Sequence, residues 1–197
     1  MIVDLMRHGS TGRDGFIDGR ADWPPTDAGR AQIERQTQGR AWSSIRSSPL
    51  QRAREPAMRV AAALRLTATV DADWAELDFG QWDGRRRAEI EASPEGRAAL
   101  AAFHADPVAH PPPGGEAWSG FEERIGRALA RLLDDGREPA LIVTHAGPIR
   151  MALSLACGFP LDRLWALRIG YGTRVRVEIG RGDDGRPWGE IVEIVQP

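Results

Sequence analysis

The stretch IVDLMRHG, residues 2–9, begins as a buried strand and ends in reactive side chains. Ile2 to Met6 are mostly apolar, a pattern typical of a strand covered on both faces. The strand then delivers an arginine, a histidine and a glycine side by side. A second stretch, PALIVTHAG at 139–147, repeats the order of apolar strand, histidine and glycine turn. The two stretches predict parallel strands whose carboxyl ends meet at one edge of a sheet.

Strand-like and helix-like patterns alternate along the rest of the chain, which indicates an α/β layered fold. We expect strands at 2–6, 44–47, 68–70 and 139–144, and helices at 26–39, 48–64, 116–133 and 149–157. Thr26 fits a helix N-cap, and Ser48 with Pro49 fits an N-cap followed by proline at the first helical position.

Two further segments complete the expected architecture. The tail alternates apolar and polar residues after Thr173 and again after Trp188, which predicts an edge β-hairpin with Arg174 and Arg176 on its polar face. Residues 74–115 contain the breakers ELDFGQWDG and PPPGGE around one interrupted helix. We therefore expect a single domain, residues 1–197, with a cap-like insertion at about 74–115.

Composition and charge limit the classes of partner and location. The net charge is −2, so nothing indicates affinity for nucleic acid or for an anionic membrane. No run approaches the ~18 apolar residues of a membrane span, and the first residues do not resemble a signal peptide, so we expect a cytoplasmic protein. The single cysteine excludes an intrachain disulfide. All 26 basic residues are arginines, so an anion site must use guanidinium, imidazole or backbone N–H groups.

The predicted strand ends bring four donors toward one point. They are Arg7 and His8 after the first strand, His145 after the 139–144 strand, and Arg52 on the helix after the 44–47 strand. Such a cluster would bind a dianion, most simply a phosphate, with help from backbone N–H groups at the glycine turn and helix start that follow, such as that of Ala146. Each of these residues alone also has a structural interpretation, and the nearby Arg54 and Arg59 rival Arg52.

A histidine in such a site can also react. A neutral imidazole is a nucleophile toward phosphorus, and His8 is our candidate. Arg7, Arg52 and a protonated His145 would hold the phosphoryl oxygens during transfer. Glu76, at the head of ELDFGQW, is the candidate acid for the leaving oxygen, although a solvated surface glutamate is the simpler interpretation of this residue alone.

Six motifs in order resemble the histidine phosphatase superfamily, also called phosphoglycerate-mutase-like. They are LMRHGST (5–11), GRADWPPTDAGRAQ (19–32), SSPLQRA (47–53), ELDFGQWDG (76–84), PGGEAWSGFEERI (113–125) and VTHAGPIR (143–150). The resemblance implies a three-layer αβα sandwich and a two-step phosphoryl transfer that uses no metal and no cofactor. It implies that His8 is phosphorylated, that Glu76 acts as acid and then base, and that Thr11 adds a hydroxyl contact to the phosphate.

The chain departs from the family pattern at two positions beside the first motif. The usual glutamate after His-Gly is Ser10, and the usual asparagine is Asp14. A carboxylate near a phosphate would repel it, so we expect Asp14 to point away from the site. Neither change removes the five residues expected to perform the chemistry.

Three kinds of family member compete. The short insertion, the FGQWDG loop and the RIGYGTRVRVEI tail look most like α-ribazole-phosphate phosphatases of cobalamin assembly, which release a nucleoside that Phe79, Trp82 or Trp118 would stack on. A broad sugar or nucleotide phosphatase and a phosphoglycerate mutase, which is an isomerase, are the alternatives; a protein-directed or inactive member is less consistent with the intact motifs. We expect a small phosphorylated metabolite as partner, and whether the chain forms a homodimer stays open.

Overall fold

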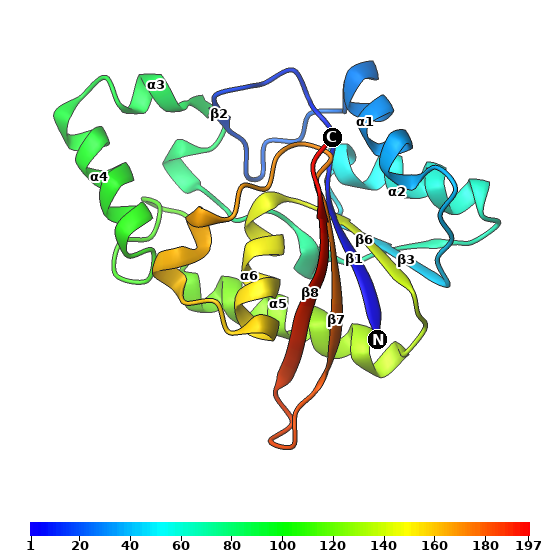
Figure 1. Cartoon of the computed structure of the whole chain (residues 1–197). Coiled ribbons are helices and arrows are strands. Elements are labelled where there is room, and N and C mark those ends of the chain that lie inside the picture. Colours follow the sequence, from blue (N-terminus) through cyan, green and yellow to red (C-terminus); the bar gives the residue numbers. More distant parts are fainter.

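A six-stranded sheet forms the centre of the molecule, which a computed structural model describes over residues 1–197 (Figure 1). The strands lie in the order β4 (Ala68–Val70), β3 (Ser44–Ser47), β6 (Ala140–Thr144), β1 (Ile2–Arg7), β7 (Arg174–Arg181) and β8 (Pro187–Val195). The first four are parallel, while β7 and β8 run antiparallel as a hairpin at the edge. The prediction of a mostly parallel α/β sheet with an antiparallel C-terminal edge is confirmed.

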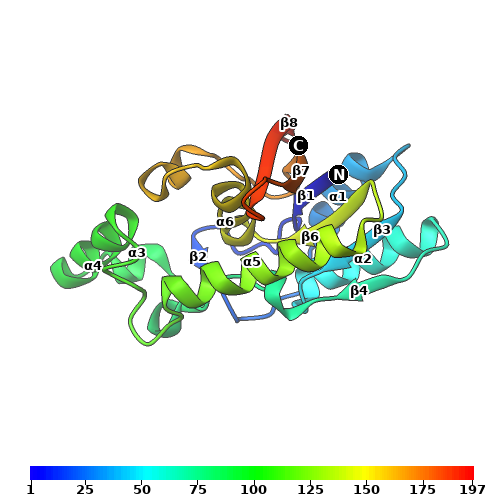
Figure 2. The ribbon, with the colours of Figure 1, turned by 90° about the horizontal axis from the view of Figure 1, so that it is seen from below.

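Helices cover both faces of this sheet and make it the middle of three layers (Figure 2). On one face lie α1 (Asp27–Thr37) and α2 (Gln51–Ala63), with a small apolar core that includes Ile33, Ile45 and Val143. On the other lie α5 (Trp118–Asp135) and α6 (Ala146–Cys157), with a larger core that includes Leu5 and Ile142. No helix is both long enough and apolar enough to cross a membrane.

The register of the parallel strands brings the functional positions to one edge. Arg7 pairs with Thr144, and Ser47 pairs with Val143. The backbone N–H of His8 donates to the Thr144 oxygen at 2.9 Å, and that of Ser48 donates to the Val143 oxygen at 3.0 Å. His8, Ser48 and His145 therefore follow directly from three neighbouring strands.

The insertion lies beyond this edge and beside α5 and α6 (Figure 1). It contains the 3-10 turns η1 (Ala72–Trp74) and η2 (Gly80–Trp82), strand β5 (Arg85–Arg86), and helices α3 (Arg87–Ile90) and α4 (Pro94–Ala105). The interruption expected in this helix falls at Ser93-Pro94, where the Ser93 hydroxyl caps α4 by accepting from the Gly96 N–H at 3.0 Å. A short strand β2 (Phe16–Ile17), which we did not predict, joins the 9–25 loop to β5. A third 3-10 turn, η3 (Leu161–Ala166), follows α6.

Two predicted helix starts differ from the structure, and a third is confirmed. Thr26 caps α1 as expected, with its hydroxyl accepting from the Gly29 N–H at 3.1 Å. Ser48 is not the cap of α2: the helix begins at Gln51, and Ser48 serves the site instead. Helix α6 begins at Ala146, three residues before the expected start, because the first turn of a helix tolerates proline.

Arg174 and Arg176 share one face of β7, as the alternation predicts, but this face is not simply solvent-exposed. Arg174 is fully buried and pairs with the Asp4 carboxylate at 2.8 Å. Trp42 and Arg176 also donate to Asp4, at 2.7 and 2.8 Å. Burial tends to raise the pKa of Asp4, but these hydrogen bonds outweigh it and lower the pKa. The alternation predicted which way these side chains face but not the burial of Arg174, because this face of β7 carries a buried ion-pair network that hydrophobicity alone does not reveal.

Candidate active site

His8 lies in the pocket in a defined tautomer. Its side chain is 5% exposed, and Nδ1 lies 2.8 Å from the Gly9 carbonyl oxygen. Because a carbonyl can only accept, Nδ1 carries a proton, and in the neutral ring Nε2 therefore keeps its lone pair. No protein group makes a hydrogen bond to Nε2. This arrangement leaves the distal nitrogen available to attack an electrophile.

His145 faces His8 and is held by two hydrogen bonds. The two ring centroids are 5.0 Å apart. Arg52 Nε donates to His145 Nδ1 at 3.3 Å, and Nε2 lies 2.7 Å from the Ser48 hydroxyl. Because a guanidinium can only donate, the proton of neutral His145 is on Nε2 and points to Ser48. Sequence reasoning missed Ser48, although it follows β3 as His8 follows β1.

Electrostatics favour the neutral form of both histidines. Burial lowers the pKa of His8 well below its usual range, and the charges of Arg7 and Arg52 add to the effect. Burial and then the Arg52 charge do the same to the pKa of His145. Neutral imidazole suits the nucleophile. The lowered pKa argues against the protonated His145 that we expected. The nearby charges of the site are positive, and the ring already accepts a hydrogen bond from the Arg52 guanidinium.

Two guanidiniums, one partly buried (Arg7) and one fully buried (Arg52), supply the positive charge. Arg7 donates from Nη1 to the Ile169 oxygen at 2.8 Å and stacks over the Tyr171 ring at 4.0 Å, while its Nε has no partner. Arg52 contacts His145 and also donates to the carbonyl oxygens of Asp18, Gly19 and Ala21 at 2.6–3.0 Å. Neither guanidinium has a carboxylate within 4.0 Å. Both therefore present charge that an anion would complement.

Glu76 lies at the same edge of the sheet, against the start of α6. Its Oε1 accepts from the Leu77 N–H at 3.0 Å, and its Oε2 accepts from the Gly147 N–H at 3.3 Å. The residue is 9% exposed and lines the cavity beside Arg7. The solvated alternative for Glu76 is thus excluded.

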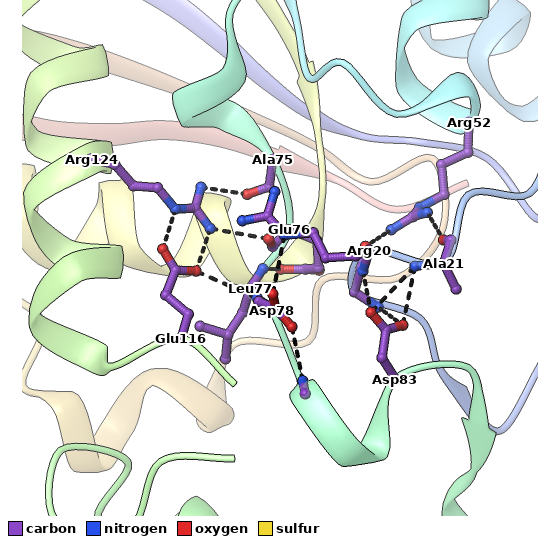
Figure 3. A network of polar contacts seen from close by, with 12 residues as sticks. Arg20, Ala21, Arg52, Ala75, Glu76, Leu77, Asp78, Asp83, Glu116 and Arg124 are labelled. Atoms are coloured by element: carbon purple, nitrogen blue, oxygen red, sulfur yellow. Dashed lines mark hydrogen bonds and ion pairs between the residues drawn. The ribbon is translucent and has the colours of Figure 1, made fainter. Parts of the chain in front are cut away.

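An ion pair between a buried arginine and a partly buried glutamate holds the backbone around Glu76 (Figure 3). Arg124, on α5, pairs with Glu116 at 2.6 Å. Its other N–H groups donate to the carbonyl oxygens of Asp73 and Ala75 at 2.7 Å and of Glu76 at 3.0 Å. The clamp fixes the chain on the N-terminal side of Glu76 and at Glu76 itself. Sequence reasoning did not single out either residue of this pair.

The loop at 18–21 is fixed from two sides (Figure 3). Arg52 binds its carbonyl oxygens, as described, and the Asp83 carboxylate accepts from the N–H groups of Gly19, Arg20 and Ala21 at 2.6–3.3 Å. Asp83 belongs to the insertion. The loop therefore connects the insertion to the arginine that faces His145.

A cavity of about 340 Å³ extends from these groups toward the insertion. Its walls are largely aromatic and aliphatic, including Phe79, Phe121 and Trp118, and Arg7, Glu76 and Ala146 lie at its inner end. A smaller chamber of about 40 Å³ contains Thr11 beside His8, Arg52 and Tyr171.

Several expected residues take different places. Asp14 is exposed, as expected. The backbone of Ser10 fixes the loop, since its N–H donates to the Gln32 side chain and its carbonyl oxygen accepts from the Thr26 hydroxyl. Trp82 packs in the core and does not line the cavity. Tyr171, which stacks on Arg7 near His8, and Arg150, which lines the cavity, were not predicted. No cluster of three or more His, Cys, Asp or Glu side chains is arranged to hold a metal ion.

Comparison with known proteins agrees with this geometry. The model of the histidine phosphatase superfamily (branch 1) matches residues 3–186. The chain belongs to this superfamily. A bifunctional protein of Mycobacterium tuberculosis is 35% identical over 77% of the chain, but the chain spans only 43% of that relative's length. The adenosylcobalamin/alpha-ribazole phosphatase of Escherichia coli is 26% identical and covers 92% of the chain, with 91% of its own length matched.

A solved structure supports the fold alone. The mycobacterial glucosyl-3-phosphoglycerate phosphatase in complex with VO3 superposes with a TM-score of 0.86 and 23% identity. The match covers 98% of this chain and 97% of the other. The three-layer architecture of this superfamily is therefore the architecture of the chain.

Proposed function

We propose that this chain hydrolyses small phosphomonoesters through a phosphohistidine formed on His8. One observation carries the proposal: a buried neutral imidazole, with Nε2 unbonded, lies beside two guanidiniums that have no carboxylate partner. Positive charge without a counter-ion calls for an anion, and a nucleophile at that point calls for an electrophilic centre within the anion. A phosphate ester supplies both.

The first step transfers the phosphoryl group to His8. The Nε2 lone pair forms the N–P bond while the P–O bond to the leaving group breaks. Arg7 and Arg52 bind the phosphoryl oxygens, where charge is held during transfer. Glu76, protonated at this stage, gives its proton to the leaving oxygen, so that an alcohol departs and not an alkoxide.

The second step returns the enzyme to its starting state. Glu76, now a carboxylate, takes a proton from water, whose oxygen attacks phosphorus as the N–P bond breaks. Inorganic phosphate leaves, and His8 is again neutral. His145 stays neutral in our scheme; with its ring nitrogens bonded to Ser48 and Arg52, it positions the Arg52 guanidinium beside the phosphoryl group.

α-Ribazole 5'-phosphate is the first named substrate to test, because a relative that covers nine-tenths of the chain is named for it. The aromatic wall of the cavity, with Phe79 and Trp118, would accept an apolar base. Sugar phosphates, nucleotides and phosphoglycerates are the competing substrates, and phosphoglycerate conversion without phosphate release would indicate a mutase.

The decisive experiment compares His8→Ala with His110→Ala on p-nitrophenyl phosphate. His110 is exposed and does not line the cavity, so its variant is the matched control. We expect the His8 variant to lose at least ~1,000-fold in kcat, because it lacks the nucleophile, and the control to keep its activity. Acid-labile phosphate on the wild-type protein after rapid quenching would identify the intermediate. Near-normal hydrolysis by the His8 variant contradicts the mechanism, and a parallel assay in excess chelator tests its independence of metal.

A further inference from the structure

The arginines of this chain separate into two groups by their ion pairs. Most have a carboxylate within 4.0 Å. Those that do not are exposed to solvent, with only three exceptions, which are Arg7, Arg52 and Arg150. Arg7 and Arg52 are assigned to the phosphate. Arg150 is a third guanidinium withdrawn from water without a counter-ion, and it lines the same 340 Å³ cavity.

Arg150 is held with one edge free. Its Nε and Nη2 donate to the Leu167 carbonyl oxygen at 3.2 and 3.0 Å, and its guanidinium lies 5.2 Å from the centre of the Trp165 ring. Nη1 makes no hydrogen bond to the protein. The Nη1–Nη2 edge therefore keeps two N–H groups, the spacing of which matches the two oxygens of a carboxylate. Burial lowers the pKa of Arg150, which is consistent with an incompletely compensated charge.

The position of Arg150 relates it to the leaving group. Gly147, whose N–H binds Glu76, lies three residues earlier on α6, so the two residues share one face of the helix about one turn apart. Glu76 is the carboxylate that could act as a counter-charge for Arg150, although the two make no ion pair within 4.0 Å. In our mechanism, however, Glu76 is protonated while the ester is bound, so Arg150 has no counter-charge at that stage.

We propose that Arg150 binds a carboxylate carried by the leaving group, a few bonds from the ester oxygen that Glu76 protonates. The proposal rests on the proposed phosphatase function and narrows its substrate class to compact phosphomonoesters of hydroxy acids. The apolar wall with Phe79, Trp118 and Leu164 would enclose the short carbon skeleton between the two anionic groups. An uncharged nucleoside, as in α-ribazole 5'-phosphate, would leave Arg150 without a partner and should be a poorer substrate.

Binding of phosphonates tests this inference without turnover, because their C–P bond is not hydrolysed. The matched probes are 3-phosphonopropionate and its carboxylate methyl ester, measured by calorimetry on the wild-type protein. We expect the free acid to bind about 10-fold or more tightly, as a charge-assisted bidentate contact implies. Equal affinities for the two probes would overturn the inference.

Variants then assign the effect to one side chain. Arg150→Met should abolish the preference for the acid and leave the affinity for the ester within about twofold, whereas Arg35→Met should keep the wild-type preference. Arg35 is exposed, unpaired and on α1, away from the cavity. An Arg150 variant that weakens both probes equally, or that keeps the preference, contradicts a carboxylate site. Failure of the wild-type protein to bind either probe would instead remove the phosphate site, and with it the proposed function.

Discussion

The Glu76 carboxylate occupies the space that a side chain at Gly147 would need. A Cβ built on Gly147 would lie 2.2 Å from Glu76 Oε1 and 3.3 Å from its carboxyl carbon. The absence of that carbon lets the carboxylate reach the Gly147 N–H at the start of α6. The glycine of VTHAGPIR is thus required by close approach to the acid from the ELDFGQW stretch, and φ plays no part.

Gly147→Ala is therefore expected to displace the acid and leave the nucleophile in place. We expect kcat for an alkyl phosphate such as glycerol 3-phosphate to fall about 100-fold, because general acid catalysis contributes on this scale. Hydrolysis of p-nitrophenyl phosphate should fall much less, since its leaving group needs little protonation. Steady-state kinetics on both esters check this. Gly120→Ala, where a new Cβ meets nothing within 4 Å, is the matched control. Equal losses on the two esters would contradict displacement of the acid.

Arg124 is expected to position the same acid from the other side. Arg124→Met removes three hydrogen bonds to the backbone around Glu76 and leaves the largely enclosed Glu116 carboxylate, 17% exposed, without its partner. We expect the free energy of unfolding to fall by about 3–5 kcal/mol. The folded fraction should also lose activity more on alkyl than on aryl phosphates. Urea unfolding gives the first quantity.

A double variant, Glu116→Gln with Arg124→Met, separates stability from position. It removes the uncompensated charge, so stability should recover in part, while the substrate-dependent loss of activity should remain because the backbone clamp is still absent. Recovery of alkyl phosphatase activity together with stability would show that the pair only stabilises the fold.

Parallel strands made most of the site predictable from the sequence. IVDLMRHG and PALIVTHAG read as buried strands, and the rule that ligands bind at the carboxyl ends of such strands placed His8 near His145 before any coordinates. Arg52 and Glu76 could be assigned only through the resemblance to a family. No local pattern distinguishes Arg52 from its neighbour Arg54, and none distinguishes Glu76 from a surface glutamate. The close packing of Gly9, where a Cβ would lie 2.0 Å from the Gly29 oxygen, was likewise invisible in one sequence.

Residues that act through tertiary contacts escaped sequence analysis for a physical reason. Ser48-Pro49 fits a helix cap equally well, and only the pairing of β3 with β6 shows that Ser48 lies beside His145. Arg124 and Arg174 are buried because each is paired with a carboxylate. Predictions from polarity assume that arginine is exposed, as it usually is, and therefore miss such residues. Such positions are visible only when the partner is known.

Ser48 is expected to set the tautomer of His145. Ser48→Ala leaves the buried His145 Nε2–H without an acceptor, which should cost about 1–3 kcal/mol in the free energy of unfolding. We also expect weaker phosphate binding, because the ring loses one of its two fixed contacts. Nitrogen-15 NMR of the imidazoles should show the proton on Nε2 in the wild-type protein and a mixture of tautomers in the variant. Ser43→Ala, in which an exposed serine is changed, is the control. An unchanged His145 spectrum in Ser48→Ala would contradict the assignment.

The two buried histidines should also make stability depend on pH in a defined window. Burial holds the pKa of both well below the usual histidine value of about 6.5, so below that pH the unfolded chain binds protons that the folded protein does not. Stability is therefore complete above pH 6.5 and falls as the pH falls, until the depressed pKa values of the folded state are reached. Each histidine contributes up to about 1.4 kcal/mol per pH unit within the window. Urea unfolding from pH 7.5 to 4.5 measures the slope.

Replacing the histidines assigns that slope to the site. His8→Gln should reduce it by up to about half, and His110→Gln, at an exposed position, should leave it unchanged. His104 retains a smaller share, since burial lowers its pKa too. Inorganic phosphate should stabilise the wild-type protein, because a bound anion offsets the Arg7 and Arg52 charges that disfavour the protonated rings. A slope that is independent of His8 between pH 6.5 and 4.5 would mean that its imidazole binds a proton as readily in the folded protein as in the unfolded chain, and would contradict the lowered pKa of His8.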